Sequence, residues 1–288
     1  MPERVLVIGA SGMLGAPVAR QLAADGYTLR ALSRNPERAA GALGTDIEIV
    51  RGDVEDADSL RKAMGGCQRL HLSVDGAGDW DLERRGATHA ARAASELGLR
   101  RITYISGASA FEENAWFPMT HAKVAAEKVI RESGVPFTFF KCTMFNEALP
   151  RFVHGNRAMV MGRQPHRWHF LAAEDYARAV SRAHGSDHAA GKALFIYGPE
   201  ALTVEEALRV YCARCAPQAQ ITHVPFWVLS LMARLPGRQK LKDVGLPMMR
   251  YFSRVKETGD PAEANDLLGP CTTTLAQWCE RQSTTTCT

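Results

Sequence analysis

The chain has 288 residues, of which 46% are hydrophobic, 23% charged and 8% aromatic. This is the composition of an ordinary soluble globular protein, and it excludes a largely disordered chain, a collagen-like fibre and a small disulfide scaffold. The 35 Lys and Arg residues nearly balance the 31 Asp and Glu residues, for a net charge of +4. Because no dense basic run is present either, we expect no nucleic-acid partner.

The cysteine distribution and the lack of a signal-peptide pattern favour a reducing compartment. The seven cysteines are an odd number and are scattered along the chain. The first residues run into a buried-strand pattern without the layout of a signal peptide. The longest apolar stretch, 224–233, is shorter than the roughly 20 residues of a membrane-spanning helix. We therefore expect a cytoplasmic protein.

Short apolar runs alternate with amphipathic helical segments through the first half of the chain. Strands are expected at 5–8, 27–32, 47–50, 69–74, 101–106 and 137–141, and helices at about 13–24, from 36, and at 57–64, 82–97 and 120–132. Six such alternations predict parallel βαβ units. The expected fold is therefore α/β, a doubly wound parallel Rossmann sheet with helices on both faces.

Beyond Pro150 this alternation stops. A strand near 194–197 is expected, which could return to the main sheet, and Thr203 with Glu206 forms a capping box at the start of a helix. We expect a Rossmann domain over 1–150 and a smaller, mostly helical substrate or lid subdomain over 151–288.

A glycine-rich loop directly follows the first strand and opens the first helix: Gly9-Ala10-Ser11-Gly12-Met13-Leu14-Gly15. Glycine lets the backbone turn sharply and approach a pyrophosphate without an intervening Cβ. The following helix directs N–H groups and its positive dipole end at the anion. A tight turn with nothing bound is the alternative, but the strand–loop–helix context predicts dinucleotide binding.

The end of the second strand indicates which dinucleotide is preferred. A site for NAD(H) would place Asp or Glu there, whereas this chain has Ser33-Arg34-Asn35. A guanidinium–phosphate contact of about 1.5–3 kcal/mol corresponds to about one to two decades of preference for NADP(H) over NAD(H). The alternative is that Arg34 is a solvated turn residue. Asp53 and Val54 are expected at the adenine, unless Asp53 only caps the next turn.

Several segments together resemble the NmrA-like, atypical branch of the short-chain dehydrogenase/reductase superfamily. They are the glycine loop, Leu32–Pro36, Gly52–Asp56, Arg101–Gly107, the passage from His121 through Lys123 and Glu127 to Thr138, and Asp175-Tyr176-Ala177. The resemblance implies a Rossmann fold and an NADP(H) cofactor. It implies either a reductase of quinones, dyes or phenylpropanoid ethers, or a protein that binds the nucleotide without turnover.

The superfamily's usual catalytic pair is Tyr-x-x-x-Lys, but Met119 stands four residues before Lys123. In the branch that resembles isoflavone and phenylcoumaran ether reductases, a lysine at the position of Lys123 is catalytic. The resemblance thus makes Lys123 the candidate that holds the nicotinamide ribose and relays a proton. The alternative is a surface ladder in which Lys123 and Arg131 flank Glu127 at i,i+4 spacing.

Further candidates lie at other strand ends. Ser106 and Ser109 follow the fifth strand, while Phe145 and Trp168 could wall an aromatic substrate or simply pack in the core. The family that the chain resembles usually has Arg-Pro where this chain has Lys141-Cys142. The expected cofactor-binding residues are Gly9, Ser11, Gly12, Met13, Leu14, Gly15, Ser33, Arg34, Asp53, Val54, Ser73, Ser106 and Lys123. The expected substrate residues are Ser109, Phe145 and Trp168, and no metal is expected.

An apolar run is followed by basic residues over 224–242. An interfacial membrane anchor is one interpretation. Because the run is apolar nearly all round, a buried helix or a subunit contact is favoured. The function we expect is NADPH-dependent reduction of a small carbonyl, quinone or aromatic molecule by direct hydride transfer. The alternative is a non-catalytic NADP(H)-binding redox sensor, regulator or membrane-complex assembly factor.

Overall fold

The computed structural model describes residues 2–44, 47–74, 76 and 78–285, the last three of them by backbone alone. The chain forms two compact units. The first unit comprises Met1–Cys142, Ala173–Ile196 and Asp260–Pro270, and the second comprises Thr143–Ala172, Tyr197–Gly259 and Cys271–Thr288. The first unit is thus assembled from three separate stretches of chain. Each unit is described in turn.

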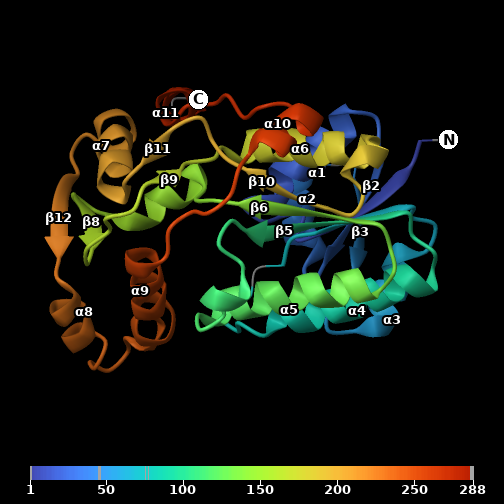
Figure 1. The fold of residues 1–288 in the computed structure, drawn as a ribbon, viewed down its shortest axis with the longest axis horizontal. Helices are drawn as coiled ribbons and strands as arrows, with labels where there is room; N and C mark the ends of the chain where they lie inside the picture. Colours follow the sequence, from blue (N-terminus) through green and yellow to red (C-terminus); the bar gives the residue numbers. More distant parts are fainter. Residues whose placement is uncertain (1, 45–46, 75, 77, 286–288) are drawn as a thin grey trace. The chain divides into compact units, whose positions relative to one another are not determined.

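A seven-stranded parallel sheet forms the centre of the first unit, in the order β10-β6-β5-β4-β1-β2-β3 (Figure 1). This confirms the expected doubly wound Rossmann fold. The strand order reverses beside β1, which is where such sheets bind ligands. The strands are β1 (Arg4–Ile8), β2 (Thr28–Ser33), β3 (Glu48–Arg51), β4 (Arg69–Leu72), β5 (Arg101–Gly107), β6 (Phe137–Cys142) and β10 (Lys192–Ile196). The strand expected near 194–197 does return to this sheet, because β10 pairs with β6 in parallel.

Helices cover both faces of this sheet. Figure 1 shows α3, α4 and α5 on one face and α1 and α6 on the other. The helices of this unit are α1 (Gly15–Ala24), α2 (Pro36–Leu43), α3 (Ala57–Met64), α4 (Leu82–Glu96), α5 (Pro118–Glu132), α6 (Ala173–Gly185) and α10 (Ala262–Leu268). The first helix begins at Gly15 rather than at Met13, because a turn closed by the Gly12 N–H on the Gly9 carbonyl, at 2.9 Å, precedes it.

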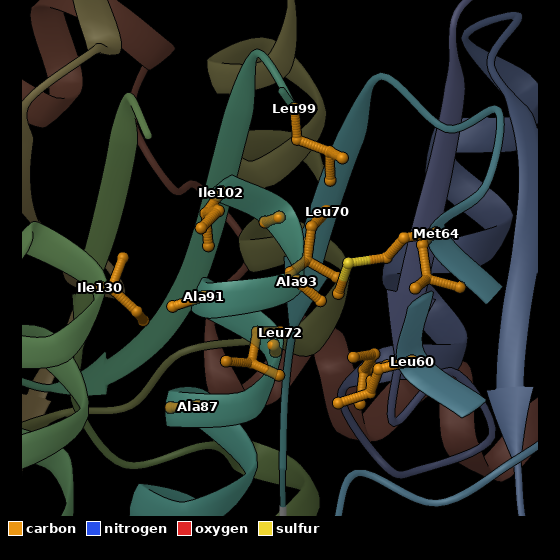
Figure 2. Close-up of a cluster of buried hydrophobic side chains, with 14 of the residues drawn as sticks. Leu60, Met64, Leu70, Leu72, Ala87, Ala91, Ala93, Leu99, Ile102 and Ile130 are labelled. Atoms are coloured by element: carbon orange, nitrogen blue, oxygen red, sulfur yellow. The ribbon is translucent and has the colours of Figure 1, made fainter. Parts of the chain in front are cut away.

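The core between the sheet and α3–α5 is built from small residues on α4 and large ones around them (Figure 2). Ala87, Ala90 and Ala94 are fully buried. A Cβ added at Gly86 would lie 3.1 Å from Val54 Cγ2. The short side chains therefore let α4 approach the ends of the neighbouring strands closely, which places its first turn near the carboxyl edge of the sheet.

Three hydrogen-bonded polar side chains, His71, Thr103 and His184, are buried together at α6. The Nδ1 atom of His71 lies 2.9 Å from Thr103 Oγ1, which in turn lies 3.1 Å from His184 Nε2. Burial lowers the pKa of His71 to about 3. Burial, followed by repulsion from His71, lowers the pKa of His184 well below its usual value. Both imidazoles are therefore neutral near pH 7 and share hydrogen bonds through the threonine hydroxyl.

The second unit contains two small sheets and several helices. The strands are β7 (Val153–His154), β8 (Arg157–Met161) and β12 (Gln220–Val224) in one sheet, and β9 (Trp168–His169) and β11 (Ala201–Leu202) in the other. The helices include α7 (Val204–Cys215), α8 (Phe226–Met232), α9 (Leu246–Arg254) and α11 (Leu275–Thr285). The predicted capping box is present, since Thr203 and Glu206 bond reciprocally at the start of α7.

The apolar run at 224–233 forms α8 but is not a buried helix. Of the residues in α8 only Leu229 is classed as buried, whereas Trp227 is 71% and Leu231 58% exposed. The expectation of burial is therefore wrong for one side of this helix. Within the described residues, no helix combines the length and apolar character needed to cross a membrane.

Candidate functional site

The glycine loop lies where β1 meets α1, and its glycines are required sterically. Gly9 has a φ of +81°, and a Cβ placed on it would lie 1.9 Å from the carbonyl oxygen of Ser73. A Cβ on Gly15 would lie 2.1 Å from the Gly9 carbonyl oxygen. The backbones after β1 and β4 therefore pass each other too closely for any side chain, and Ser73, a predicted cofactor-binding residue, lies beside the loop.

The start of α1 is suited to an anion. Among the described residues, no side chain caps this helix end and no acidic residue lies in its first turn. Ser11, Gly12 and Met13 are exposed. The helix therefore presents N–H groups and its positive dipole end to solvent beside the glycine loop, so these residues fit a pyrophosphate.

Two exposed guanidinium groups lie at the ends of β2 and β3. Arg34 follows β2, and Arg51 ends β3 in register with Ser33. The Arg51 Nη1 atom donates to the Arg34 carbonyl at 3.2 Å. Sequence reasoning named Arg34 but missed Arg51, although its place at the end of the third strand was readable. Arg51 also forms an exposed ion pair with Glu37 at 3.3 Å, so a phosphate at this edge would have to compete with that carboxylate for Arg51.

Asp53 lies in a local turn. Its Oδ1 atom accepts the Glu55 N–H at 3.1 Å, which matches the turn-capping alternative. Ser59 Oγ accepts the Asp53 N–H at 3.0 Å and holds the same turn. Val54 is half-buried, and its carbonyl oxygen lies 3.1 Å from His89 Nδ1 on α4.

Lys123 projects from α5 toward the carboxyl end of β5. Its Nζ atom lies 2.8 Å from Glu83 Oε1 and donates to the Ile105 carbonyl at 3.3 Å. The Tyr104 hydroxyl also donates to Glu83 Oε1, at 2.7 Å. The side chains of Lys123 and Glu83 are only 16% and 7% exposed. Burial raises the pKa of Tyr104 well above its usual value, so this phenol stays protonated and serves as a donor.

Of the surface ladder considered as the alternative for Lys123, only the Glu127–Arg131 pair is formed, and Lys123 takes no part in it. Glu127 pairs instead with Lys141 at 2.5 Å and with Arg131 at 3.9 Å. It also accepts the hydroxyl of Ser106 at 2.5 Å. Ser106 is buried and points into this network, and burial lowers the pKa of Lys141. The i,i+4 interpretation of Lys123 is therefore wrong, because topology offers it a buried carboxylate on α4. Sequence reasoning missed Glu83, since 40 residues separate the partners.

The expected substrate residues are divided between the units. Ser109 is buried in the first unit, whereas Phe145 and Trp168 are buried in the second. Trp168 packs edge-to-face on Phe252 with ring centroids 5.4 Å apart, as the core-packing alternative anticipates.

A polar cluster in the second unit was not predicted. His169 Nδ1 lies 2.7 Å from Glu257 Oε2, and the imidazole stacks on Tyr197 at 4.9 Å. Burial raises the pKa of Glu257. Nothing in the local sequence links these residues, which lie far apart along the chain.

Cavities in both units lie away from the predicted residues. One of about 350 Å³ in the first unit is lined by Gln21, Asp25, Tyr27, Arg178, Ser181 and Arg182. Another of about 510 Å³ in the second unit is lined by Glu147, Pro150, Tyr211, Arg214, Cys215, Trp278 and Gln282. No group of three or more potential metal ligands occurs in the part of the chain that the structure describes.

Sequence comparison places the chain among nucleotide-binding proteins. A family model described as NAD(P)H-binding matches residues 9–181. The chain is 32% identical over 206 residues to (4-alkanoyl-5-oxo-2,5-dihydrofuran-3-yl)methyl phosphate reductase from Streptomyces griseus, covering 70% of each. It is also 28% identical over 150 residues to Photosystem II assembly factor Ycf39 from Cyanophora paradoxa, covering 50% of this chain and 46% of that protein.

The fold is similar to that of two solved reductases. Triphenylmethane reductase from Citrobacter sp., complexed with NADP(H), superposes with a TM-score of 0.78 at 19% identity and covers 97% of this chain and 99% of its own. NADPH-dependent quinone oxidoreductase from Escherichia coli, complexed with NADPH, gives a TM-score of 0.75 at 21% identity and covers 96% and 99%. The chain belongs to the NAD(P)H-binding family, and its first unit has that family's Rossmann fold.

Proposed function

We propose that this protein is an NADPH-dependent reductase of a small carbonyl-bearing, quinone or aromatic molecule. The first unit would bind the nucleotide, and the second would shape the substrate site. The observation that carries the proposal is the partly buried ammonium of Lys123, held on the buried carboxylate of Glu83 beside the carboxyl end of β5. A solvated surface lysine has no use for a buried carboxylate partner, whereas a lysine side chain held in one orientation requires such a partner to fix it.

The nucleotide would be held by residues at the carboxyl edge of the first unit's sheet. The Gly9–Gly15 loop and the start of α1 would take the pyrophosphate, and Arg34 with Arg51 would take a 2′-phosphate. Ser33, Asp53, Val54 and Ser73 complete the proposed cofactor set. Because Ser106 already donates to Glu127, its proposed role is to fix the wall of the site rather than to bind the cofactor directly.

When bound, the nicotinamide cofactor supplies the hydride. Lys123 would donate hydrogen bonds to the ribose hydroxyls and orient them, while its ion pair with Glu83 fixes the position of the ammonium. The Tyr104 hydroxyl donates to the same oxygen of Glu83 and so helps to fix the carboxylate. Since Met119 replaces the usual tyrosine, the proton for the product would come from solvent or a neighbouring hydroxyl.

Nucleotide titration tests the cofactor half of the proposal. We expect the purified protein to bind NADPH more tightly than NADH by fluorescence. Arg34→Ala and Arg51→Ala should each reduce this preference about 10- to 100-fold, because each removes a charge-assisted contact. Arg92→Ala, which removes an exposed cation of α4, is the matched control. A preference unchanged in both test variants would remove the 2′-phosphate assignment.

Turnover tests the catalytic half. A screen of quinones, triphenylmethane dyes and aromatic carbonyl compounds would follow NADPH oxidation at 340 nm. Lys123→Ala should lower kcat by on the order of 100-fold or more, whereas NADPH affinity should fall far less. Lys128→Ala, an exposed lysine on the same helix, is the control. If a substrate is found and Lys123→Ala turns it over at the normal rate, Lys123 has no part in the mechanism.

A non-catalytic role is the second candidate function. Photosystem II assembly factor Ycf39 proteins recur among the relatives of this chain, at 21–28% identity. Nucleotide binding with no substrate that oxidises NADPH, together with NADPH-dependent capture of a defined partner, would favour this candidate over a reductase.

A further inference from the structure

The second unit carries an exposed apolar strip followed by a basic one, which we call the 226–242 segment. Trp227 and Leu231 lie four residues apart on α8 and therefore share one face. Leu235 follows in the turn after the helix. Their exposed fractions are 71%, 58% and 56%. Of the six exposed large hydrophobic side chains among the residues that the structure describes, three thus lie within nine residues, and such clustering marks an interaction surface.

The opposite side of α8 fixes the helix to the second unit. Leu229 and Ala233 are buried and form a cluster with Leu246 of α9, to which Phe226 and Met161 add partly buried contacts. The exposed face is therefore presented by an anchored helix, and its exposure does not come from an unpacked chain end.

The net positive charge of the chain falls within this segment. Residues 226–242 contain four cations, Arg234, Arg238, Lys240 and Lys242, and no carboxylate. The chain as a whole has a net charge of +4, so the remaining residues are formally neutral. All four cations are exposed, and none of them forms an ion pair with a carboxylate in the described ranges of the chain.

We infer that the 226–242 segment docks the protein on an anionic lipid surface. Trp227, Leu231 and Leu235 would enter the headgroup region, and the four cations would contact lipid phosphates. Tryptophan favours this interface, because its ring is apolar and its N–H remains hydrated. Apolar insertion and basic contacts together give reversible peripheral binding without a spanning helix.

Charge argues against a second copy of this chain as the occupant. A symmetric dimer places the same patch of both copies face to face. The four cations of one copy would then oppose the four of the other with no carboxylate in the segment to neutralise them. An anionic membrane instead gives those cations their counter-charges.

Vesicle flotation of the full-length protein tests the inference. We expect binding to phosphatidylcholine vesicles that contain one third phosphatidylglycerol, little binding to pure phosphatidylcholine, and release in about 0.5 M salt. Trp227→Ala should weaken the partition coefficient about 10-fold or more. Converting Arg234, Arg238, Lys240 and Lys242 to Gln should weaken it by on the order of 100-fold.

Matched variants separate this surface from general stickiness. Trp116→Ala removes another exposed tryptophan, and a second quadruple variant converts the exposed cations Arg20, Lys62, Arg92 and Lys128 of the first unit to Gln. Both should float like the parent protein. The inference is overturned by equal binding to both vesicle types, by no binding, or by an equal loss in the control variants. Self-association that Trp227→Ala abolishes would assign the surface to a second copy.

Discussion

The buried histidine pair makes the first unit sensitive to acid. His71 has a pKa of about 3 in the folded chain, against an ordinary value of 6.5. Between these values the unfolded chain binds a proton that the folded chain excludes, so stability falls as the pH drops below 6.5. At pH 5 the loss from His71 alone is about 2 kcal/mol relative to pH 7.5. His184 contributes in the same direction.

Urea unfolding at several pH values measures this loss. The free energy of unfolding of the wild-type protein and of His71→Gln would be followed by far-UV circular dichroism from pH 7.5 to 5. Glutamine keeps a polar group near Thr103 but takes up no proton, so the variant should lose about 2 kcal/mol less over this range. His188→Gln, at an exposed histidine, should retain the wild-type slope. Equal slopes for wild type and His71→Gln would refute the reasoning.

Three further predictions concern the nucleotide-binding edge. Glu83→Gln should cost about 3 kcal/mol of unfolding free energy, because it leaves the partly buried ammonium of Lys123 without its counter-charge. Lys123→Met should recover part of this loss in a double-mutant cycle, and strictly additive values would contradict the pair. Gly9→Ala should abolish NADPH binding in a fluorescence titration, since its Cβ would lie 1.9 Å from the Ser73 carbonyl oxygen; normal affinity would show that the loop relaxes freely. Asn35→Ala should cost about 1 kcal/mol of stability in thermal unfolding, because the Asn35 side chain caps α2. An unchanged Tm would show that this cap does not contribute to stability.

The fold was predictable because local patterns and topology agree in the first unit. Continuous apolar runs such as Val5–Ile8 have the character of strands buried on both faces, and parallel pairing follows once helices separate them. The glycine loop was predictable for the same reason, since its position between a strand and a helix determines its geometry.

Partners that are distant in sequence were not predictable in the same way. Periodicity placed Lys123 near Glu127 on one helix, yet the lysine side chain turns to Glu83 on the neighbouring helix α4. That choice depends on how closely α4 and α5 pack, which no local window contains. The exposure of Trp227 was missed for a related reason, since composition describes a helix as apolar without showing how much of it the protein covers.

The first unit is discontinuous along the chain, and this has a consequence for its folding during synthesis. Strand β6 ends at Cys142, but its partner β10 begins only at Lys192, so about 50 residues must be added before the sheet is complete. At ribosomal speeds of about 5–20 residues per second, β6 spends roughly 3–10 s as an edge strand with unpaired N–H and C=O groups. The nascent chain is therefore most prone to intermolecular strand pairing while the intervening residues are being translated.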